Sequence, residues 1–187
     1  MVDKTDIESV LQLYIDLGQA DYIGEPVSQI EHMSQAAQLA MRAGSDDEVI
    51  LAAFFHDIGH LCELHEPSKS MGDFGVVNHE RVGADFLRRI GFPETVARLV
   101  ECHVEAKRYL VWKDPAYLLS LSEASLETLN HQGGAMSDEE AKSFEVDPLF
   151  ERYILLRKWD EAAKQTDVPV LDLDVIRKLA FKVCNTK

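Results

Sequence analysis

Histidine and aspartate side chains lie along this sequence in an order that could bind metal ions. His56 and Asp57 are adjacent within the apolar string AAFFHDIGH. Burying an ionised aspartate beside a histidine is unfavourable unless a cation compensates, and a metal ion would supply that compensation. A lone His-Asp pair is a weak indication, because salt bridges and helix caps explain most such pairs. Four further side chains in apolar helical surroundings strengthen it: His32, His79, His103 and Asp160.

The donor types indicate which metals would suit such a cluster. Helical bundles build metal sites when several helices each direct an imidazole or a carboxylate into one core. Imidazole and carboxylate ligands with open positions match iron or manganese. No cysteine belongs to the set, so a structural zinc site is not expected.

Apolar residues recur at intervals of three and four, which predicts helices and no strand pair. The expected helices cover residues 7–17, 27–43, 49–60, 77–90, 93–109, 121–130, 149–164 and 171–183. Ser45 and Glu48 have capping-box spacing before the third helix, and Ser137 and Glu140 repeat that spacing where a ninth helix would begin. A polar stretch over residues 63–75 predicts a long loop. The fold class is therefore all-α, a helical bundle of eight to nine helices.

Length and composition bound the class of protein. The chain has 187 residues with 46% apolar and 28% charged side chains, a globular balance that favours a single domain over residues 1–187. Its formal net charge of −14 argues against nucleic-acid binding through a basic surface. The first residues are too acidic for a signal peptide, and no stretch approaches the roughly 20 apolar residues of a membrane span. Three cysteines without a CxxC pair argue against disulfides, so a cytoplasmic protein is expected.

The ordered set His…His-Asp…His…His…Asp resembles the HD-domain superfamily of metal-dependent enzymes. In that pattern the first histidine, the HD pair and the last aspartate bind one metal. The two intervening histidines bind a second metal in the dinuclear members, and the HD aspartate bridges both. The resemblance implies one metal held by His32, His56, Asp57 and Asp160, and another held by His79, His103 and the bridging Asp57.

Longer strings narrow the resemblance to one branch of that superfamily, the HD-domain mixed-valent di-iron oxygenases. The chain is similar to those that cleave 2-amino-1-hydroxyethylphosphonate or its trimethylammonio relative in the strings DYIGE, HDIGH, NHERVGADFLRRIGF, HVEAKRYLV, LSEASLETLNHQGG and LRKWDEAAKQTD. Myo-inositol oxygenase is a more distant member. The agreement in length and motif order extends over nearly the whole chain.

Membership of that branch would imply an oxidative reaction. Two Fe ions per chain, a mixed-valent Fe(II)/Fe(III) pair, would work with O2 as co-substrate. The C–P bond of a 1-hydroxy-2-aminoethylphosphonate, its nitrogen free or N-methylated, would be cleaved to phosphate and glycine or glycine betaine. The partner would be a small-molecule phosphonate in organophosphonate catabolism, supplied by an upstream phosphonate hydroxylase.

The resemblance also implies catalytic and substrate-binding residues. Tyr22 would ligate one iron until substrate arrives, and Glu25 would meet the substrate's amino group. His60 and Lys107, each four residues beyond a candidate ligand, would bind the phosphonate as cations. Hydrogen bonds would complete the phosphonate pocket from Ser125, Thr128 and Gln132. From the residues alone, Tyr22 would be an ordinary loop tyrosine, Glu25 an acid at a helix N-terminus and Lys107 a solvated lysine.

The nitrogen substituent and the reaction class both leave alternatives open. Phe54 and Phe74, together with Tyr22 and Glu25, could hold a methylated nitrogen. The alternative enzyme is an HD phosphohydrolase that acts on nucleotides or phosphomonoesters with Mn²⁺ or Mg²⁺. A non-catalytic, ligand-binding HD module is a third possibility.

Cationic residues near the last candidate ligand have no fixed role in the sequence pattern. Lys164, four residues after Asp160, could pair with a carboxylate or with the substrate. Arg157 and its neighbour Lys158 fit a solvated surface equally well.

Overall fold

The computed structural model describes residues 4–22, 24–65 and 78–185. The helices within these ranges are α1 (Lys4–Leu17), α2 (Gln29–Arg42), α3 (Asp47–Phe55), α4 (Ile58–His65), α5 (His79–Ile90), α6 (Glu94–Glu101), α7 (His103–Lys113), α8 (Pro115–Ser120), α9 (Glu123–His131), α10 (Asp138–Glu145), α11 (Phe150–Ala162) and α12 (Leu173–Asn185). One isolated backbone bridge joins Asp21 to Ser28. The expected all-α class is confirmed. None of these helices is both long and apolar enough to cross a membrane.

The described ranges hold twelve helices, where eight or nine were expected. The helix expected to run through His56 and Asp57 is broken there into α3 and α4, and the one expected to run through Cys102 is broken into α6 and α7. Pro115 begins the short helix α8, which was not expected. Each break spans only one or two residues between apolar segments. The apolar periodicity continues across such a short break, so the sequence pattern does not reveal it.

Two of the expected helix starts test the capping-box pattern. Before α3 the expected pairing of Ser45 with Glu48 is wrong, because Asp46 is the N-cap and its side chain accepts a backbone N–H in the first turn. An aspartate next to a serine offers the stronger acceptor at a helix N-terminus. Before α10 the pairing of Ser137 with Glu140 is confirmed, with both reciprocal hydrogen bonds present.

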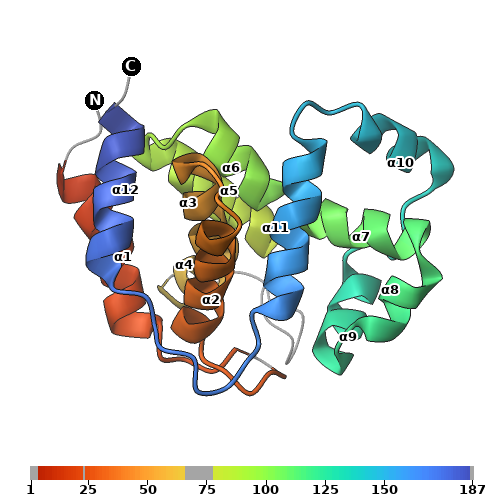
Figure 1. Cartoon of the computed structure of the whole chain (residues 1–187), viewed down its shortest axis with the longest axis horizontal. Coiled ribbons are helices and arrows are strands. Elements are labelled where there is room, and N and C mark those ends of the chain that lie inside the picture. Colours follow the sequence, from red (N-terminus) through yellow and green to blue (C-terminus); the bar gives the residue numbers. More distant parts are fainter. Residues whose placement is uncertain (1–3, 23, 66–77, 186–187) are drawn as a thin grey trace.

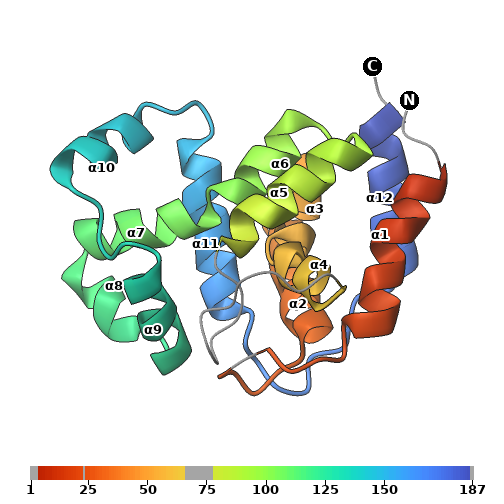
Figure 2. The same ribbon diagram turned by 180° about the vertical axis from the view of Figure 1, so that it is seen from behind.

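Helices α2 and α3 lie at the centre of the molecule (Figure 1). On one flank α1 and α12 lie side by side, and α5 and α6 cover the face seen in Figure 2. On the opposite flank α11 packs on α2, α3 and α7, and α7 to α10 extend beyond it. Every side chain of α3 from Val49 to Phe55 is buried, because this helix is apolar on all sides and can be enclosed completely.

Phe54, one of the aromatic residues expected near a substrate nitrogen, lies in the core instead. It is fully buried, and its ring centroid lies 4.6 Å from that of Tyr14. Phe74, another of these residues, lies outside the described residues. The prediction that a loop begins at residue 63 is wrong, because α4 continues to His65.

Candidate active site

The six candidate ligands meet at one buried centre and come from widely separated segments. Each is at most 5% exposed to solvent. Their positions are His32 on α2, His56 at the end of α3, Asp57 in the break before α4, His79 at the start of α5, His103 at the start of α7 and Asp160 on α11. The two helix breaks therefore contribute to the centre, because His56, Asp57 and His103 lie in or directly beside them.

One group of donor atoms gathers around His32. Its Nε2 atom lies 3.0 Å from Nε2 of His56 and 3.4 Å from Oδ1 of Asp160. Oδ2 of Asp57 lies 3.5 Å from Nε2 of His32 and 3.4 Å from Nε2 of His56. Donor atoms of His32, His56 and Asp160 all lie within 4.8 Å of one another, which fits coordination of one ion.

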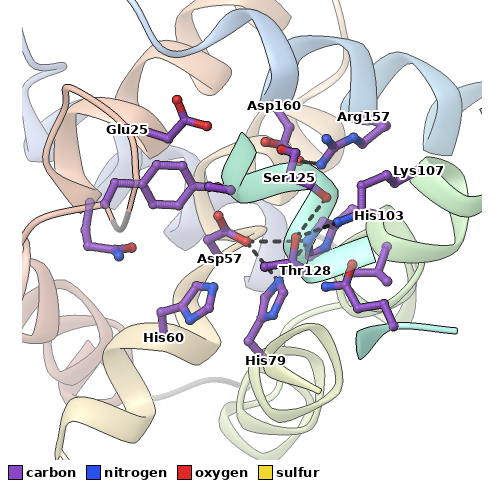
Figure 3. A pocket seen from close by; sticks show the side chains of 15 residues that line it. Glu25, Asp57, His60, His79, His103, Lys107, Ser125, Thr128, Arg157 and Asp160 are labelled. Atoms are coloured by element: carbon purple, nitrogen blue, oxygen red, sulfur yellow. Dashed lines mark hydrogen bonds and ion pairs between the residues drawn. The ribbon is translucent and has the colours of Figure 1, made fainter. Parts of the chain in front are cut away.

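The other oxygen of Asp57 faces a second group. Oδ1 lies 3.2 Å from Nε2 of His79 and 3.4 Å from Nε2 of His103. Those two nitrogens are 3.1 Å apart. Figure 3 shows Asp57 in the middle of the pocket with both histidines beside it. Asp57 thus presents one oxygen to each histidine pair, as a carboxylate between two metals would.

Helix ends fix the direction in which three of the imidazoles point. Backbone carbonyls in the last turn of a helix lack an intrahelical partner. Two such carbonyls and one at a C-cap lie within hydrogen-bond distance of Nδ1 atoms of candidate ligands: Ala53 O from His56 at 2.9 Å, Val100 O from His103 at 2.7 Å and the C-cap Ala163 O from His32 at 2.9 Å. Donation of the Nδ1 proton to these carbonyls leaves each Nε2 lone pair directed into the centre.

The electrostatics of the centre favour a bound cation. Lone pairs on two Nε2 atoms 3.0 Å apart repel each other unless a proton or a metal ion lies between them. Although burial alone would lower the pKa of His56, the charges of Asp57 and Asp160 raise it to about 10. Burial alone would raise the pKa values of both carboxyls, but His56 beside Asp57 and Arg157 beside Asp160 hold them well below their usual range. The donor set and its charge therefore fit a metal centre.

The position of His79 depends on a close approach between α4 and α5. A Cβ atom added at Gly59 would lie only 1.9 Å from the backbone oxygen of His79. On the facing helix, a Cβ at Gly83 would lie 3.1 Å from the backbone nitrogen of Gly59. Only glycine at position 59 lets the two backbones come this close, so Gly59 is needed to bring His79 to the centre.

A pocket beside the metal ligands has a cation and hydroxyl groups in its wall (Figure 3). Lys107 on α7 is 3% exposed, and its Nζ donates to Oγ1 of Thr128 on α9 at 3.0 Å. Ser125 and Gln132 line the same pocket. Burial and the charge of Arg157 lower the pKa of Lys107 to about 7. The structure thus brings together four of the residues expected to hold a phosphonate.

His60 also lines the pocket, but not as the expected cation. Its ring stacks on that of His79, with centroids 4.1 Å apart and planes 18° apart. Burial and the charge of His79 lower the pKa of His60 to about 3. A neutral imidazole can exchange a hydrogen bond with a ligand but brings it no charge. One of its nitrogens also lies within 4.8 Å of donor atoms of Asp57 and His79.

The loop between α1 and α2 brings Tyr22 and Glu25 to the pocket. The Tyr22 ring stacks on that of His32, with centroids 4.0 Å apart and planes 13° apart. Burial and nearby carboxylates raise the pKa of Tyr22 well above its usual value. Oε1 of Glu25 lies 2.8 Å from Nζ of Lys164 and accepts a hydrogen bond from Oγ of Ser122 at 2.5 Å. Both residues therefore line the same pocket as four of the candidate ligands, and their roles stay predictions.

Arg157 is part of the site, although the sequence fitted a surface position equally well. Its side chain is buried and pairs with both Asp160 and Glu161. The sequence did contain a signal for these ion pairs, because Asp160 and Glu161 follow Arg157 by three and four residues on one helix. Nζ of Lys164 lies 3.1 Å from Oε1 of Glu161. Alternating charges therefore run from Glu25 through Lys164, Glu161 and Arg157 to Asp160.

Comparisons with known proteins agree with this geometry. The HD-domain family model matches residues 30–147. An uncharacterized protein of Acanthamoeba polyphaga mimivirus is 44% identical over 95% of this chain and 81% of its own length. The 1-hydroxy-2-(trimethylamino)ethylphosphonate dioxygenase (glycine-betaine-forming) of Leisingera caerulea is 39% identical over 89% of this chain and 84% of its own length. The hydroxymethylphosphonate dioxygenase of Gimesia maris is also 39% identical, over 89% of this chain and 82% of its own length.

Proposed function

Because this chain belongs to the HD-domain family, we propose that it is a di-iron oxygenase that cleaves the C–P bond of a small 1-hydroxyphosphonate with O2. The observation that carries the proposal is Asp57, whose two oxygens face separate histidine pairs beside a pocket lined by the buried amine of Lys107. Two relatives named as phosphonate dioxygenases align with most of the chain and support the oxygenase class.

The proposed substrate is a 1-hydroxy-2-aminoethylphosphonate whose nitrogen is free or methylated. One substrate and one O2 give phosphate and the carboxylic acid formed from C1, so all atoms balance without a further reductant. The products are phosphate and glycine, or glycine betaine if the nitrogen is trimethylated. Glu25 at the other end of the pocket is the proposed partner of the nitrogen.

The proposed work of the protein is binding, orientation and exclusion of water. Two iron ions, as an Fe(II)/Fe(III) pair held by the six ligands, would supply the redox chemistry with O2. Lys107 would bind the phosphonate as a cation, while Ser125, Thr128 and Gln132 would fix its orientation by hydrogen bonds. Tyr22, stacked over His32, would cover the centre until substrate arrives. The buried walls would keep the reacting carbon away from water.

The test follows oxygen and phosphate together. Protein loaded with iron is supplied with 2-amino-1-hydroxyethylphosphonate, and O2 uptake is measured beside phosphate release. We expect one phosphate for each O2 consumed, because the balanced reaction needs that ratio. Loading with Mn²⁺ or Mg²⁺ instead of iron is the control and is expected to give no turnover.

The opposite result would identify a phosphohydrolase. Hydrolysis needs no oxidant, so phosphate released under strict anaerobiosis would contradict the oxygenase. Phosphate release from nucleotides or phosphomonoesters with Mn²⁺ or Mg²⁺ would contradict it as well.

A further inference from the structure

Glu25 is not a free carboxylate in this pocket. Its side chain is 8% exposed, and the ammonium of Lys164, itself 11% exposed, lies 2.8 Å away. Ser122 adds a hydrogen bond to the same oxygen. Lys164 is not among the residues that line the pocket, so it reaches Glu25 from behind the wall. The end of the pocket where the substrate's nitrogen is expected therefore already holds a paired charge.

Contacts on both sides hold Lys164 in this position. Its Nζ donates to Oγ of Ser122 and of Ser125 at 3.3 Å each, and lies 3.1 Å from Oε1 of Glu161. Glu161 in turn pairs with the buried Arg157. The cation thus stays near Glu25 even if the carboxylate turns toward a ligand, because its other partners remain.

A substrate ammonium would compete with Lys164 for one carboxylate. Pairing with Glu25 would favour the ammonium, but the second positive charge nearby would repel it, and both effects are strong away from water. An uncharged substituent of the same shape is neither attracted by the charge of Glu25 nor repelled by that of Lys164. The charge on Lys164 therefore sets how much a substrate gains by carrying a cationic nitrogen.

We propose that Lys164 is a specificity-determining residue which, by neutralising Glu25 from behind, reduces the preference of the site for phosphonates with a cationic nitrogen. The inference rests on the proposed function, because it concerns which member of the 1-hydroxyphosphonate class the site selects. It gives a physical route by which one metal centre could serve substrates with a free amine, a methylated amine or no amine.

The test compares binding of matched phosphonates that lack the reacting hydroxyl. The pairs are 2-aminoethylphosphonate with n-propylphosphonate, and 2-(trimethylammonio)ethylphosphonate with 3,3-dimethylbutylphosphonate. Members of a pair have nearly the same shape and differ in charge. Dissociation constants are measured by calorimetry on the iron-loaded protein without O2, and the readout is the affinity ratio of the cationic to the neutral member.

The charges predict an order of ratios across four variants. Lys164→Met should raise the ratio about tenfold, because Glu25 is left unpaired for the ligand. Glu25→Gln should lower it by a similar factor. The double variant removes both charges and should return the ratio close to that of the wild type. Lys164→Arg keeps the charge and should also stay close to the wild type.

Controls separate this effect from damage to the fold. Lys158→Met removes one positive charge from an exposed position of α11 and should leave the ratio unchanged. If Lys164→Met does not fold, Lys164→Gln serves instead, since its amide can still donate to Ser122 and Ser125. An affinity ratio that is equal in wild type and in folded Lys164→Met or Lys164→Gln protein would overturn the inference while leaving the proposed function intact. Failure of the wild type to bind any of the four phosphonates would overturn both.

Discussion

Among single residues, Asp57 links the two halves of the metal centre. Oδ2 lies 3.4 Å from His56 and Oδ1 lies 3.2 Å from His79, so one side chain contacts both groups of histidines. It can do so because the chain leaves the helical path between α3 and α4, which turns consecutive side chains toward different neighbours. If two metals bind as proposed, both the charge and the position of Asp57 would be needed to hold them together.

Substitution of Asp57 tests this linking role. Asp57→Ala should lose both metals, because each histidine pair loses its shared carboxylate and the charge that attracts a cation. Tyr22→Phe is the control, since it keeps the ring stacked on His32 and removes only the hydroxyl; it should keep both metals. Iron per chain is measured by elemental mass spectrometry. Full iron content in a folded Asp57→Ala protein would refute the linking role.

At the residue level, the sequence was most informative where side chains have metal-binding chemistry. The ordered histidines and aspartates indicated six candidate ligands, and the structure gathers these side chains at one buried centre. Arg157 was missed as a site residue because an arginine beside a lysine on a charged helix has the same pattern as a solvated surface. The burial of Phe54 away from the pocket depends on how α3 packs against α1, which local spacing does not reveal.

At the scale of helices, close backbone packing and helix breaks position the ligands. Helix α4 approaches the start of α5 so closely that Gly59 has no room for a Cβ atom. The breaks at Asp57 and Cys102 were not predicted, since apolar periodicity continues across them. The helices that contain neither a break nor an added turn, such as α2 and α12, begin and end within a few residues of the expected positions. Amphipathic periodicity thus predicts where helices lie, but it does not predict the short breaks that set the direction of the helix ends.

A single methyl group at Gly59 should disturb the second histidine pair. Gly59→Ala should lower the free energy of unfolding by about 1–3 kcal/mol, the usual cost of overpacking, because α4 and α5 must separate. It should also lose metal held at His79 and His103. Urea unfolding and iron content are the two measurements.

A second glycine supplies the matched comparison. Gly44 has φ +73° and open space around it, so Gly44→Ala should cost about 1 kcal/mol through backbone strain alone. Its iron content should remain that of the wild type. Equal iron content in folded Gly59→Ala protein would show that the close approach is not needed for metal binding.

Considered as a whole, the molecule places local cations inside an acidic protein. The net charge of −14 repels an anionic phosphonate at long range. Buried Lys107 and Arg157, with the proposed iron ions, would oppose that repulsion inside the pocket. The ligands also tie together helices that are distant in sequence, because α2, α5, α7 and α11 all contribute to one centre. Metal binding should therefore stabilise the entire fold.

Removal of metal tests that coupling. A ligand that binds only the folded state adds about 2.7 kcal/mol when its free concentration is a hundred times its Kd, so stripping iron with a chelator should lower Tm by several degrees. Restored iron should restore Tm. Thermal unfolding followed by circular dichroism gives the measurement. Asp57→Ala, which should hold no metal, is expected to show the same Tm with and without the chelator, and an unchanged Tm in stripped wild type would contradict the coupling.

The contact between α4 and α5 has a use in annotating other sequences. A chain can keep every histidine and aspartate of the pattern and still be unable to assemble the second histidine pair, if position 59 carries any side chain. The glycine two residues after the His-Asp pair is therefore a separate criterion, which can be checked in any aligned sequence. Members that have all six donors but lack this glycine would be candidates for a single metal ion, and with it a different chemistry on the same helical framework.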